Sequence, residues 1–497
     1  MGALSDLETY RYQGDAFLAE LGRAWYRNGA GLTNELPLAD IYGRYEGLFT
    51  SEIATELVAS LDGATGDTLR SRRNLAVFAV AGAMEQAARA EAQALGEGES
   101  SATVRIAGDP VPFRSVPVLI ANEPEAARRT ELETARLRVL DDELNPIYAD
   151  LWDRRHRTAR DLGASSYRDL FAQIGGVDLP ALAAQGQRLL AETDQLYERA
   201  LDASLRQRAG TRLSAATSAD IPRVMRANEF DVRFTQRGMM PALRQTLDGL
   251  GITLDGQPNI ILDTAARPTK DTRAFCVPAR VPEEIYLVIA PAGGLDDYSA
   301  LFHESGHAQH YAGMGKSVPF EFRHLGDNAV TETFAFLMEG LLRDPAWLEW
   351  AVGGRDHDEL RRHVATTRLY LQRRLSAKLT YELAFHASDI SSMGDRYAEQ
   401  LEVATRVKWP AVRYLEDIDE GFYVAAYLRA WTLECGLRGL LRDQYGTKWF
   451  ASRKAGNFLR EIWEDGQRLS ADELARELDI PPLDLAVLTE EADRELG

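Results

Sequence analysis

The segment His303-Glu304-Ser305-Gly306-His307 constrains the local fold more than any other part of this chain. Two histidines four residues apart lie on one face of a helix, about one turn apart, so both imidazoles can reach the same ion. The glutamate after the first histidine then lies beside that ion, where it can accept a proton from water. The pattern predicts a helix with a catalytic zinc site; the alternative is a surface helix that carries two histidines by chance.

Composition and charge limit the classes of protein to which the chain can belong. Its 497 residues are 45% hydrophobic and 27% charged, as in ordinary globular proteins. A formal net charge of −19 argues against nucleic acid and anionic membrane surfaces as partners. Two cysteines cannot form a disulfide framework, and neither a signal peptide nor a membrane span is recognisable. We therefore expect a soluble, cytoplasmic protein. Nothing in the sequence sets its oligomeric state.

Apolar residues at spacings of three and four predict a mainly helical fold. The expected helices before the histidine segment cover residues 6–29, 38–61, 66–94, 123–162 and 178–208, with a break or kink at Pro146. Further helices are expected at 329–343, 358–385, 395–406 and 423–445. A boundary within 205–225 would separate an N-terminal helical lobe, residues 1–205, from a catalytic lobe, residues 206–497.

Two regions are expected to contain strands. Residues 102–106 and 111–121 flank Gly108-Asp109-Pro110 and predict a small hairpin between helices. The β-branched segments 260–262 and 285–290 predict a small sheet just before the histidine helix. The second of these strands could offer a free edge to an extended peptide, or its edge could be covered.

A catalytic zinc usually has three protein ligands, so His303 and His307 leave one to be found. Glu332 lies within an apolar stretch of the next helix, where an unpaired carboxylate would be costly and metal coordination would offset that cost. We therefore predict Glu332 as the third ligand. Glu339, two turns later, is the main competitor, although a surface position suits it better. Asp327 is expected to cap the helix.

Two further histidines lie near the predicted ligands. His310 is on the same helix but well round from the face of His303 and His307, so we expect a packing or supporting role. His324 lies on the connection between the two ligand helices, where it could contact a substrate or serve the fold.

Several segments resemble the thimet oligopeptidase and oligoendopeptidase F family of zinc metallopeptidases. Residues 302–310 are similar to the zinc motif of that family, and Glu332 follows His307 by 25 positions, as its third ligand does. The resemblance extends over roughly residues 165–440. Its other parts are Leu262-Asp263, Lys270, residues 274–278, the Glu382 and His386 pair, and residues 421–431.

The resemblance implies a mainly α, two-lobed fold with a deep channel, a small sheet beside the zinc helix and one zinc ion per chain. It also implies cleavage of short peptides in the cytoplasm. Tyr423 and Tyr427 match two of the family's tyrosine positions and are expected to include the oxyanion donor. Arg429 stands where a tyrosine is common and could bind a peptide carboxylate. The family's histidine near this motif is replaced by Gly421 or Asp417.

Three other functions are compatible with the motif. A zinc carboxypeptidase of the carboxypeptidase Taq type is also helical and built on the same histidine pattern, although this chain lacks the His-Glu-Ser-Gln-type sequence expected there. A non-catalytic peptide-binding protein would not be expected to keep both histidines, Glu304 and Glu332 together. A zinc hydrolase of a specialised peptide or amide would be compatible with the altered tyrosine region.

Overall fold

The fold, described from a computed structural model, is mainly helical with two small β-sheets. The structure describes residues 6–354, 356–387 and 389–497. None of the helices described there is long and apolar enough to cross a membrane. The mainly α prediction with a small sheet is therefore confirmed.

The chain divides into two units, each built from separate stretches of sequence. The sheet unit comprises the described parts of Met1–Val80, Asn228–Arg361 and Arg429–Asp484, and the hairpin unit comprises Ala81–Ala227, Arg362–Leu428 and Leu485–Gly497. The predicted division into residues 1–205 and 206–497 assumed a single boundary, whereas these units interleave along the chain. Helical periodicity shows which stripe of a helix is buried but not which distant helix covers it.

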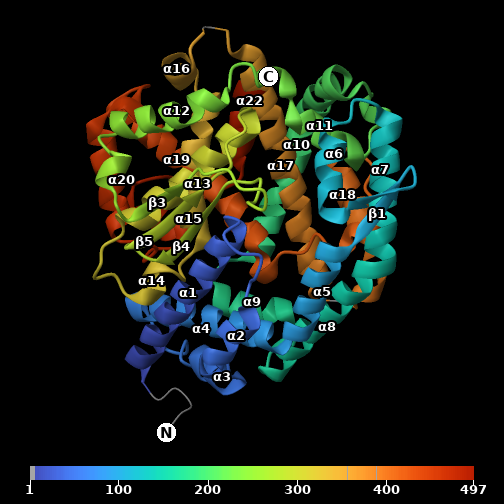
Figure 1. Ribbon diagram of the computed structural model, residues 1–497. Coiled ribbons are helices and arrows are strands. Elements are labelled where there is room, and N and C mark those ends of the chain that lie inside the picture. Colours follow the sequence, from blue (N-terminus) through green and yellow to red (C-terminus); the bar gives the residue numbers. More distant parts are fainter. Residues whose placement is uncertain (1–5, 355, 388) are drawn as a thin grey trace. The chain divides into compact units, whose positions relative to one another are not determined.

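The sheet unit contains a three-stranded sheet among helices (Figure 1). Its elements are α1 (Leu7–Gly29), α2 (Leu38–Arg44), α3 (Ser51–Ala59), most of α4 (Gly66–Ala87), α12 (Gln236–Gly249), β3 (Ile260–Asp263), β4 (Phe275–Arg280), β5 (Glu284–Val288), α13 (Leu295–Gly313), α14 (Phe320–Arg323), α15 (Asn328–Glu339), α16 (Pro345–Trp347), most of α19 (Tyr423–Tyr445), α20 (Arg453–Glu464) and α21 (Ala471–Glu477).

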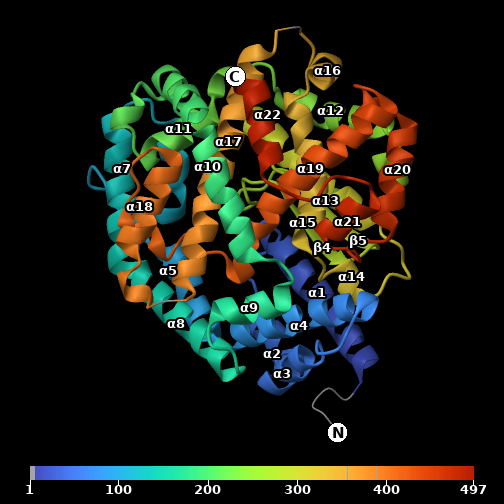
Figure 2. The ribbon, with the colours of Figure 1, turned by 180° about the vertical axis from the view of Figure 1, so that it is seen from behind.

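The hairpin unit is almost entirely helical. Its elements are α5 (Arg89–Ser101), β1 (Thr103–Ile106), β2 (Asp109–Pro112), α6 (Val116–Asn122), α7 (Ala126–Val139), α8 (Asn145–Asp161), α9 (Tyr167–Gly175), α10 (Leu179–Ser204), α11 (Ile221–Arg226), most of α17 (Asp358–Phe385), α18 (Gly394–Thr405) and α22 (Ala486–Leu496). Helices α10 and α22 lie side by side (Figure 2). The predicted break at Pro146 is not found, because a π-helical segment, Leu140–Leu144, joins α7 directly to α8; the helix is irregular just before the proline but continuous.

The order of the strands shows which of them lie at the edges of the three-stranded sheet and could pair with a further strand. The order is β3-β5-β4, with β3 parallel and β4 antiparallel to β5. The segments predicted as strands at 260–262 and 285–290 are confirmed as β3 and β5. However, β5 is the central strand, so the expectation that it could offer a free edge is wrong. The edge strands are β3 and β4.

Strand β4 was not among the predicted strands, because Pro278 interrupts its pattern. Proline is confined to strand edges and bulges, since it has no N–H for the ladder. The structure meets both conditions: β4 lies at the edge of its sheet, and its register with β5 shifts between Pro278 and Arg280. Helix α1 packs closely on β4, where a Cβ added at Gly22 would lie 2.9 Å from the Cα of Ala279.

The predicted hairpin is confirmed in its first arm and turn, but its second arm is shorter than expected. Strands β1 and β2 pair from Thr103↔Pro112 to Ile106↔Asp109. The segment 113–121, predicted as strand, instead forms a helical turn followed by α6. Pro117 explains the difference, because a proline in the first turn of a helix loses no hydrogen bond.

Candidate metal centre

Helix α13 carries the histidine pair. Its first turn includes Asp297, whose carboxylate accepts hydrogen bonds from the N–H groups of Ala292 (2.7 Å) and Gly293 (2.8 Å) and so fixes the entry to the helix. His303 and His307 follow one turn apart, with ring centroids separated by 5.0 Å. The helix ends at Gly313, two turns after His307. The helical prediction for this segment is therefore confirmed.

Helix α15 carries Glu332, the predicted third ligand. The Asp327 carboxylate accepts a hydrogen bond from the N–H of Ala329 (3.0 Å), as expected for a helix cap. Glu332 follows in the next turn, and its side chain is 3% exposed. The two helices pack closely because α13 has a glycine at their contact: a Cβ added at Gly306 would lie 2.3 Å from the carbonyl oxygen of Phe334.

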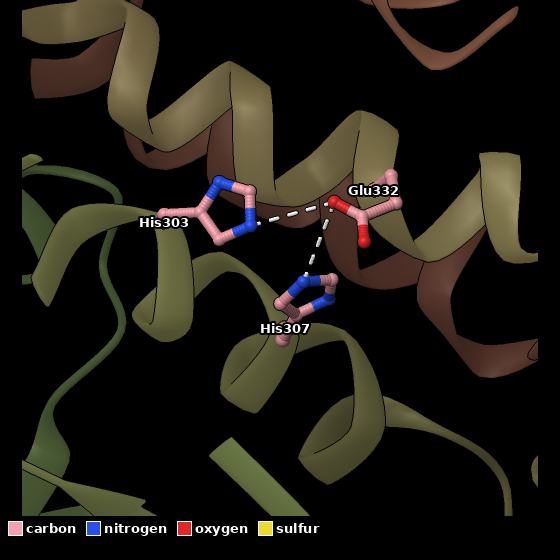
Figure 3. Close-up of side chains that lie close together, drawn as sticks. All are labelled: His303, His307 and Glu332. Carbon is pink, nitrogen blue, oxygen red and sulfur yellow. Dashed lines mark ion pairs between the residues drawn. The ribbon is translucent and has the colours of Figure 1, made fainter. Parts of the chain in front are cut away.

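Close packing of α13 on α15 makes three donor atoms converge (Figure 3). Oε2 of Glu332 lies 3.4 Å from Nε2 of His303 and 3.6 Å from Nε2 of His307. One ligand atom from each residue lies within 4.8 Å of the others, and among the described residues this is the one such group of histidine, cysteine and acidic side chains. Separations of this size suit three ligands of a single ion at bond lengths of about 2.0–2.2 Å.

Both imidazoles are held through their other ring nitrogen. Nδ1 of His303 lies 3.0 Å from Oε2 of Glu339, whose other oxygen accepts a hydrogen bond from Ser299 (2.7 Å). Nδ1 of His307 lies 2.8 Å from the hydroxyl of Thr331. A hydrogen bond at Nδ1 fixes the ring orientation and leaves Nε2 for a metal.

The electrostatics of the group favour a cation between its members. Burial lowers the pKa of His303, but hydrogen bonds and charge interactions with Glu332 and Glu339 outweigh it and raise that pKa well above the usual value. Burial lowers the pKa of His307 to about 4, so this imidazole is neutral at pH 7. A neutral imidazole and a carboxylate are the forms that ligate zinc. Two histidines and one carboxylate also form a three-ligand set that leaves a fourth position open, so the residues fit zinc.

Glu304 lies beside the group without belonging to it. Its Oε2 accepts a hydrogen bond from the backbone N–H of Cys276 in β4, at 2.8 Å. Burial, assisted by the negative charges of Glu332 and Glu339, raises the pKa of Glu304 to about 7. A carboxylate with a pKa near neutrality can both accept and return a proton.

Glu339 was considered as a third ligand or a surface residue; its side chain is 35% exposed, and it is not one of the three convergent residues. It lies two turns after Glu332 on α15 and approaches the Nδ1 side of His303, opposite the nitrogen that faces Glu332. Thr331 and Tyr311, which both contact His307, were not among the predicted site residues. The one available signal was the four-residue spacing from His303 through His307 to Tyr311, which puts all three on one face of α13.

His310 and His324 are buried away from the convergent donor atoms. His310 is 0% exposed and packs against Phe334, with ring centroids 4.7 Å apart, in agreement with the expected packing role. Nε2 of His324 lies 3.4 Å from Oδ1 of Asp15 in α1. A contact between His324 and a substrate stays a prediction.

Arg429 is held by two carboxylates of the sheet unit. One guanidinium nitrogen lies 3.0 Å from Oδ1 of Asp327, and another lies 2.6 Å from Oδ2 of Asp472. Asp327 also accepts the N–H of Ala471, so the same carboxylate serves the first turns of α15 and α21 (Figure 2). Arg429 therefore has a defined role in the fold, and its binding of a peptide carboxylate stays a prediction.

The two predicted tyrosines belong to the hairpin unit, at the start of α19. The rings of Tyr423 and Tyr427 lie 5.2 Å apart in an edge-to-face arrangement. The residues just before them, Gly421 and Phe422, both have left-handed backbone conformations, with φ of 61° and 59°. The hydroxyl of Tyr167 accepts a hydrogen bond from the N–H of Gly421 at 2.9 Å. Donation from either tyrosine to an oxyanion stays a prediction.

Comparison with protein-family models and with curated proteins finds no match to this chain. The case for a function therefore depends on the geometry of the group and on the motifs of the sequence.

Proposed function

We propose that this protein is a zinc-dependent hydrolase that cleaves peptide bonds in short peptides. The observation that carries the proposal is the convergence of His303, His307 and Glu332 beside the partly buried carboxylate of Glu304. This arrangement combines a three-ligand metal set with a general base, and those are the two parts that metal-assisted hydrolysis requires.

Each residue has a distinct task in the proposed reaction. When bound, zinc makes its water ligand more acidic and polarises the carbonyl that is attacked. Glu304 accepts the proton of the attacking water and later returns it to the leaving amine, for which its pKa of about 7 is well matched. The backbone N–H of Cys276 holds that carboxylate in place. Glu339 and Thr331 orient the two imidazoles.

Two features support a peptide as the substrate. Strand β4 is an edge strand of its sheet, and its Cys276 is hydrogen-bonded to the proposed base. An extended peptide that paired with such an edge would bring its own carbonyls close to Glu304. The resemblance of residues 302–310 and of the spacing to Glu332 to oligopeptidases is the second feature. The same resemblance, together with two cysteines that form no disulfide, supports a cytoplasmic location.

The decisive experiment is product mapping by mass spectrometry on a mixed library of peptides of roughly 5–20 residues. We expect internal cuts from the zinc-loaded protein and none from Glu304→Gln, which should retain zinc because Glu304 is not among the three ligands. Metal content measured on both proteins separates loss of the base from loss of the ion.

The other outcomes identify the alternatives. Stepwise loss of single C-terminal residues from the peptides would indicate a carboxypeptidase rather than an endopeptidase. Absence of any cleavage by a zinc-loaded parent protein would overturn the peptidase proposal and favour a specialised amide substrate. Cleavage that persists in Glu304→Gln would assign the role of base to another residue.

A further inference from the structure

A cavity of about 610 Å³ lies between the end of α12 and the helix α20. Both helices belong to the sheet unit (Figure 1). The residues that line the cavity are Asp248, Gly251, Thr253, Arg453, Asn457 and Arg460. None of them is a ligand of the candidate metal centre, and every side chain in the lining apart from the glycine is polar or charged. The cavity therefore suits a polar ligand.

Glycines bring the two walls of the cavity into backbone contact. A Cβ added at Gly456 of α20 would lie 1.8 Å from the carbonyl oxygen of Leu250, and one added at Gly249 would lie 2.7 Å from the carbonyl oxygen of Phe450. Because both neighbours are backbone atoms, the turn after α12 and the start of α20 are packed directly on one another. The walls of the cavity are therefore fixed by the fold.

Two arginines of α20 approach the same glycine on the opposite wall. The guanidinium of Arg460 donates one hydrogen bond to the carbonyl of Gly251, at 3.1 Å, and another to Oδ1 of Asn457. The stem of Arg453 passes over Gly251, where an added Cβ would lie 3.0 Å from its Cγ. Both cations are thus held at the cavity before any ligand arrives, which lowers the entropic cost of binding.

The positive charge of the cavity is not neutralised by the protein. Among the residues that the structure describes, Arg453 and Arg460 form no ion pair, and Asp248 in the same cavity pairs with neither. The first turn of α20 adds Lys454 and holds no acidic residue, although the helix dipole favours negative charge there. In a chain with a net charge of −19, such a group of cations indicates an anionic ligand.

We propose that this cavity binds a phosphomonoester of a small hydroxylated molecule. Two arginines match the charge of a phosphomonoester, about −1.5 to −2 at pH 7, and their guanidinium groups fit phosphate oxygens in pairs. The oxygen of Asn457 is already bonded to Arg460, so its amide N–H groups are left as donors, together with the hydroxyl of Thr253. The site lies outside the proposed hydrolysis and does not depend on it.

Asp248 determines what the phosphate must be attached to. A carboxylate repels a phosphate group but accepts hydrogen bonds from hydroxyl groups. The volume of the cavity is in the range of pockets for whole small molecules, so an organic part fits beside the phosphate. We therefore expect a hydroxylated phosphomonoester to bind more tightly than inorganic phosphate.

Isothermal titration calorimetry of the zinc-loaded protein at constant ionic strength tests the proposal. The probes are ribose 5-phosphate, inorganic phosphate and ribose. We expect binding of ribose 5-phosphate, weaker binding of inorganic phosphate and none of ribose. Arg453→Ala should weaken binding of both phosphates about 10- to 100-fold, the loss expected when hydrogen bonds to a charged group are removed.

Arg244→Ala is the matched control, because this exposed arginine of α12 pairs with Asp255 at 2.9 Å and does not line the cavity. It removes the same charge and should leave both affinities unchanged. Arg453 is also exposed, so its replacement should leave the stability of the protein unchanged. Asp248→Asn should strengthen binding of inorganic phosphate and reduce the preference for ribose 5-phosphate.

Phosphate can also bind a zinc ion, so the titration is repeated on Glu332→Ala, which lacks a predicted zinc ligand. Unchanged binding there supports the proposal, whereas lost binding would place the phosphate at the metal centre and overturn it. Equal affinity in Arg453→Ala and Arg244→Ala, or a preference for ribose 5-phosphate that Asp248→Asn leaves unchanged, would also overturn it. So would the absence of phosphate binding by the parent protein up to about 10 mM.

Discussion

The backbone of Phe334 in α15 lies where a side chain on Gly306 of α13 would have to be. A Cβ at Gly306 would come within 2.3 Å of the Phe334 carbonyl oxygen and 2.6 Å of the Cα of Ala335. Since both neighbours are backbone atoms, they cannot move without moving the helix. The separation of α13 and α15, and with it the distance from His303 and His307 to Glu332, therefore depends on this glycine.

We predict that Gly306→Ala pushes the two helices apart. The expected cost is about 1–3 kcal/mol of unfolding free energy. Zinc affinity should also fall, because the donor atoms no longer converge. Urea unfolding and chelator competition measure the two effects. Gly439→Ala is the control: this glycine lies in α19 with no other atom near its missing Cβ, so the change should stabilise the protein by up to about 1 kcal/mol. Unchanged zinc affinity in Gly306→Ala would contradict the prediction.

The two glutamates of α15 should differ sharply when they are replaced. Glu332 faces the Nε2 atoms of both histidines, whereas Glu339 approaches only Nδ1 of His303. We predict that Glu332→Ala abolishes tight zinc binding and that Glu339→Gln weakens it about 10- to 100-fold. Chelator competition on the metal-stripped proteins measures both. Tight zinc binding by Glu332→Ala would move the third ligand elsewhere, with Glu339 as the first candidate.

The parts of this site that sequence could predict are the parts that depend on one helix. The four-residue spacing of His303 and His307 requires only helical geometry, and an acidic residue in an apolar stretch such as that around Glu332 indicates a buried charge. The contacts of Thr331 and Glu339 depend instead on how α13 and α15 cross. That crossing depends on Gly306, whose spatial neighbour is 28 residues away in sequence.

The same distinction explains where the observed fold differs from the elements predicted from the sequence. Strands β3 and β5 have β-branched runs and were predicted, but β4 carries Pro278 and becomes a strand through its pairing with β5. The segment 113–121 has strand-like composition, yet Pro117 favours a helical start. The interleaved units have no local signal, because the order in which helices pack is a property of the whole chain.

Arg429 provides a test of whether an ion pair serves the fold. Its guanidinium is 6% exposed, and Asp327 is the more buried of its two partners. Burial lowers the pKa of Arg429, but Asp327 and Asp472 reverse the effect and raise it, so the pair is fully charged at pH 7. We predict that Arg429→Ala costs about 3 kcal/mol of unfolding free energy, because the Asp327 carboxylate is left without its cation.

Asp472→Ala is the matched control. Because the Asp472 side chain is half exposed, its loss should lower the free energy of unfolding by less than about 1 kcal/mol. The double variant Asp327→Ala with Arg429→Ala should be more stable than the sum of the single changes implies. If Arg429→Ala kept full stability and raised only the KM for peptides with a free C-terminus, the residue would bind substrate instead.

In the hairpin unit, Tyr167 should stabilise the strained residues before Tyr423. Phe422 has a left-handed backbone, which is unfavourable for a residue with a side chain, and its ring contacts that of His386 with centroids 5.0 Å apart. Tyr167→Phe removes the acceptor of the Gly421 N–H and should cost about 1–3 kcal/mol. Hydrogen exchange should accelerate at Gly421, whereas Tyr12→Phe, at an exposed position, should leave it unchanged.

Acid stability of the sheet unit should depend on Glu473 at the start of α21. Its carboxylate accepts hydrogen bonds from Arg70 (2.9 Å) and from the N–H of Ser470 (2.9 Å). Burial alone would raise the pKa of Glu473, but these bonds lower it to about 2. Because the folded pKa lies below the unfolded value of 4.5, the ionised form stabilises the fold above pH 4.5.

This contribution should be lost as the pH falls from about 4.5 to about 2, since the unfolded chain then binds a proton that the folded chain resists. Glu473→Gln should therefore lower the free energy of unfolding by about 1–2 kcal/mol at pH 7 and by progressively less toward pH 2. Urea unfolding at a series of pH values measures the difference. Glu477→Gln changes an exposed position of the same helix and should have the same free energy of unfolding as the parent protein at every pH. If the difference in unfolding free energy between Glu473→Gln and the parent protein were the same at pH 7 and pH 2, the charge of Glu473 would not be the cause of that difference.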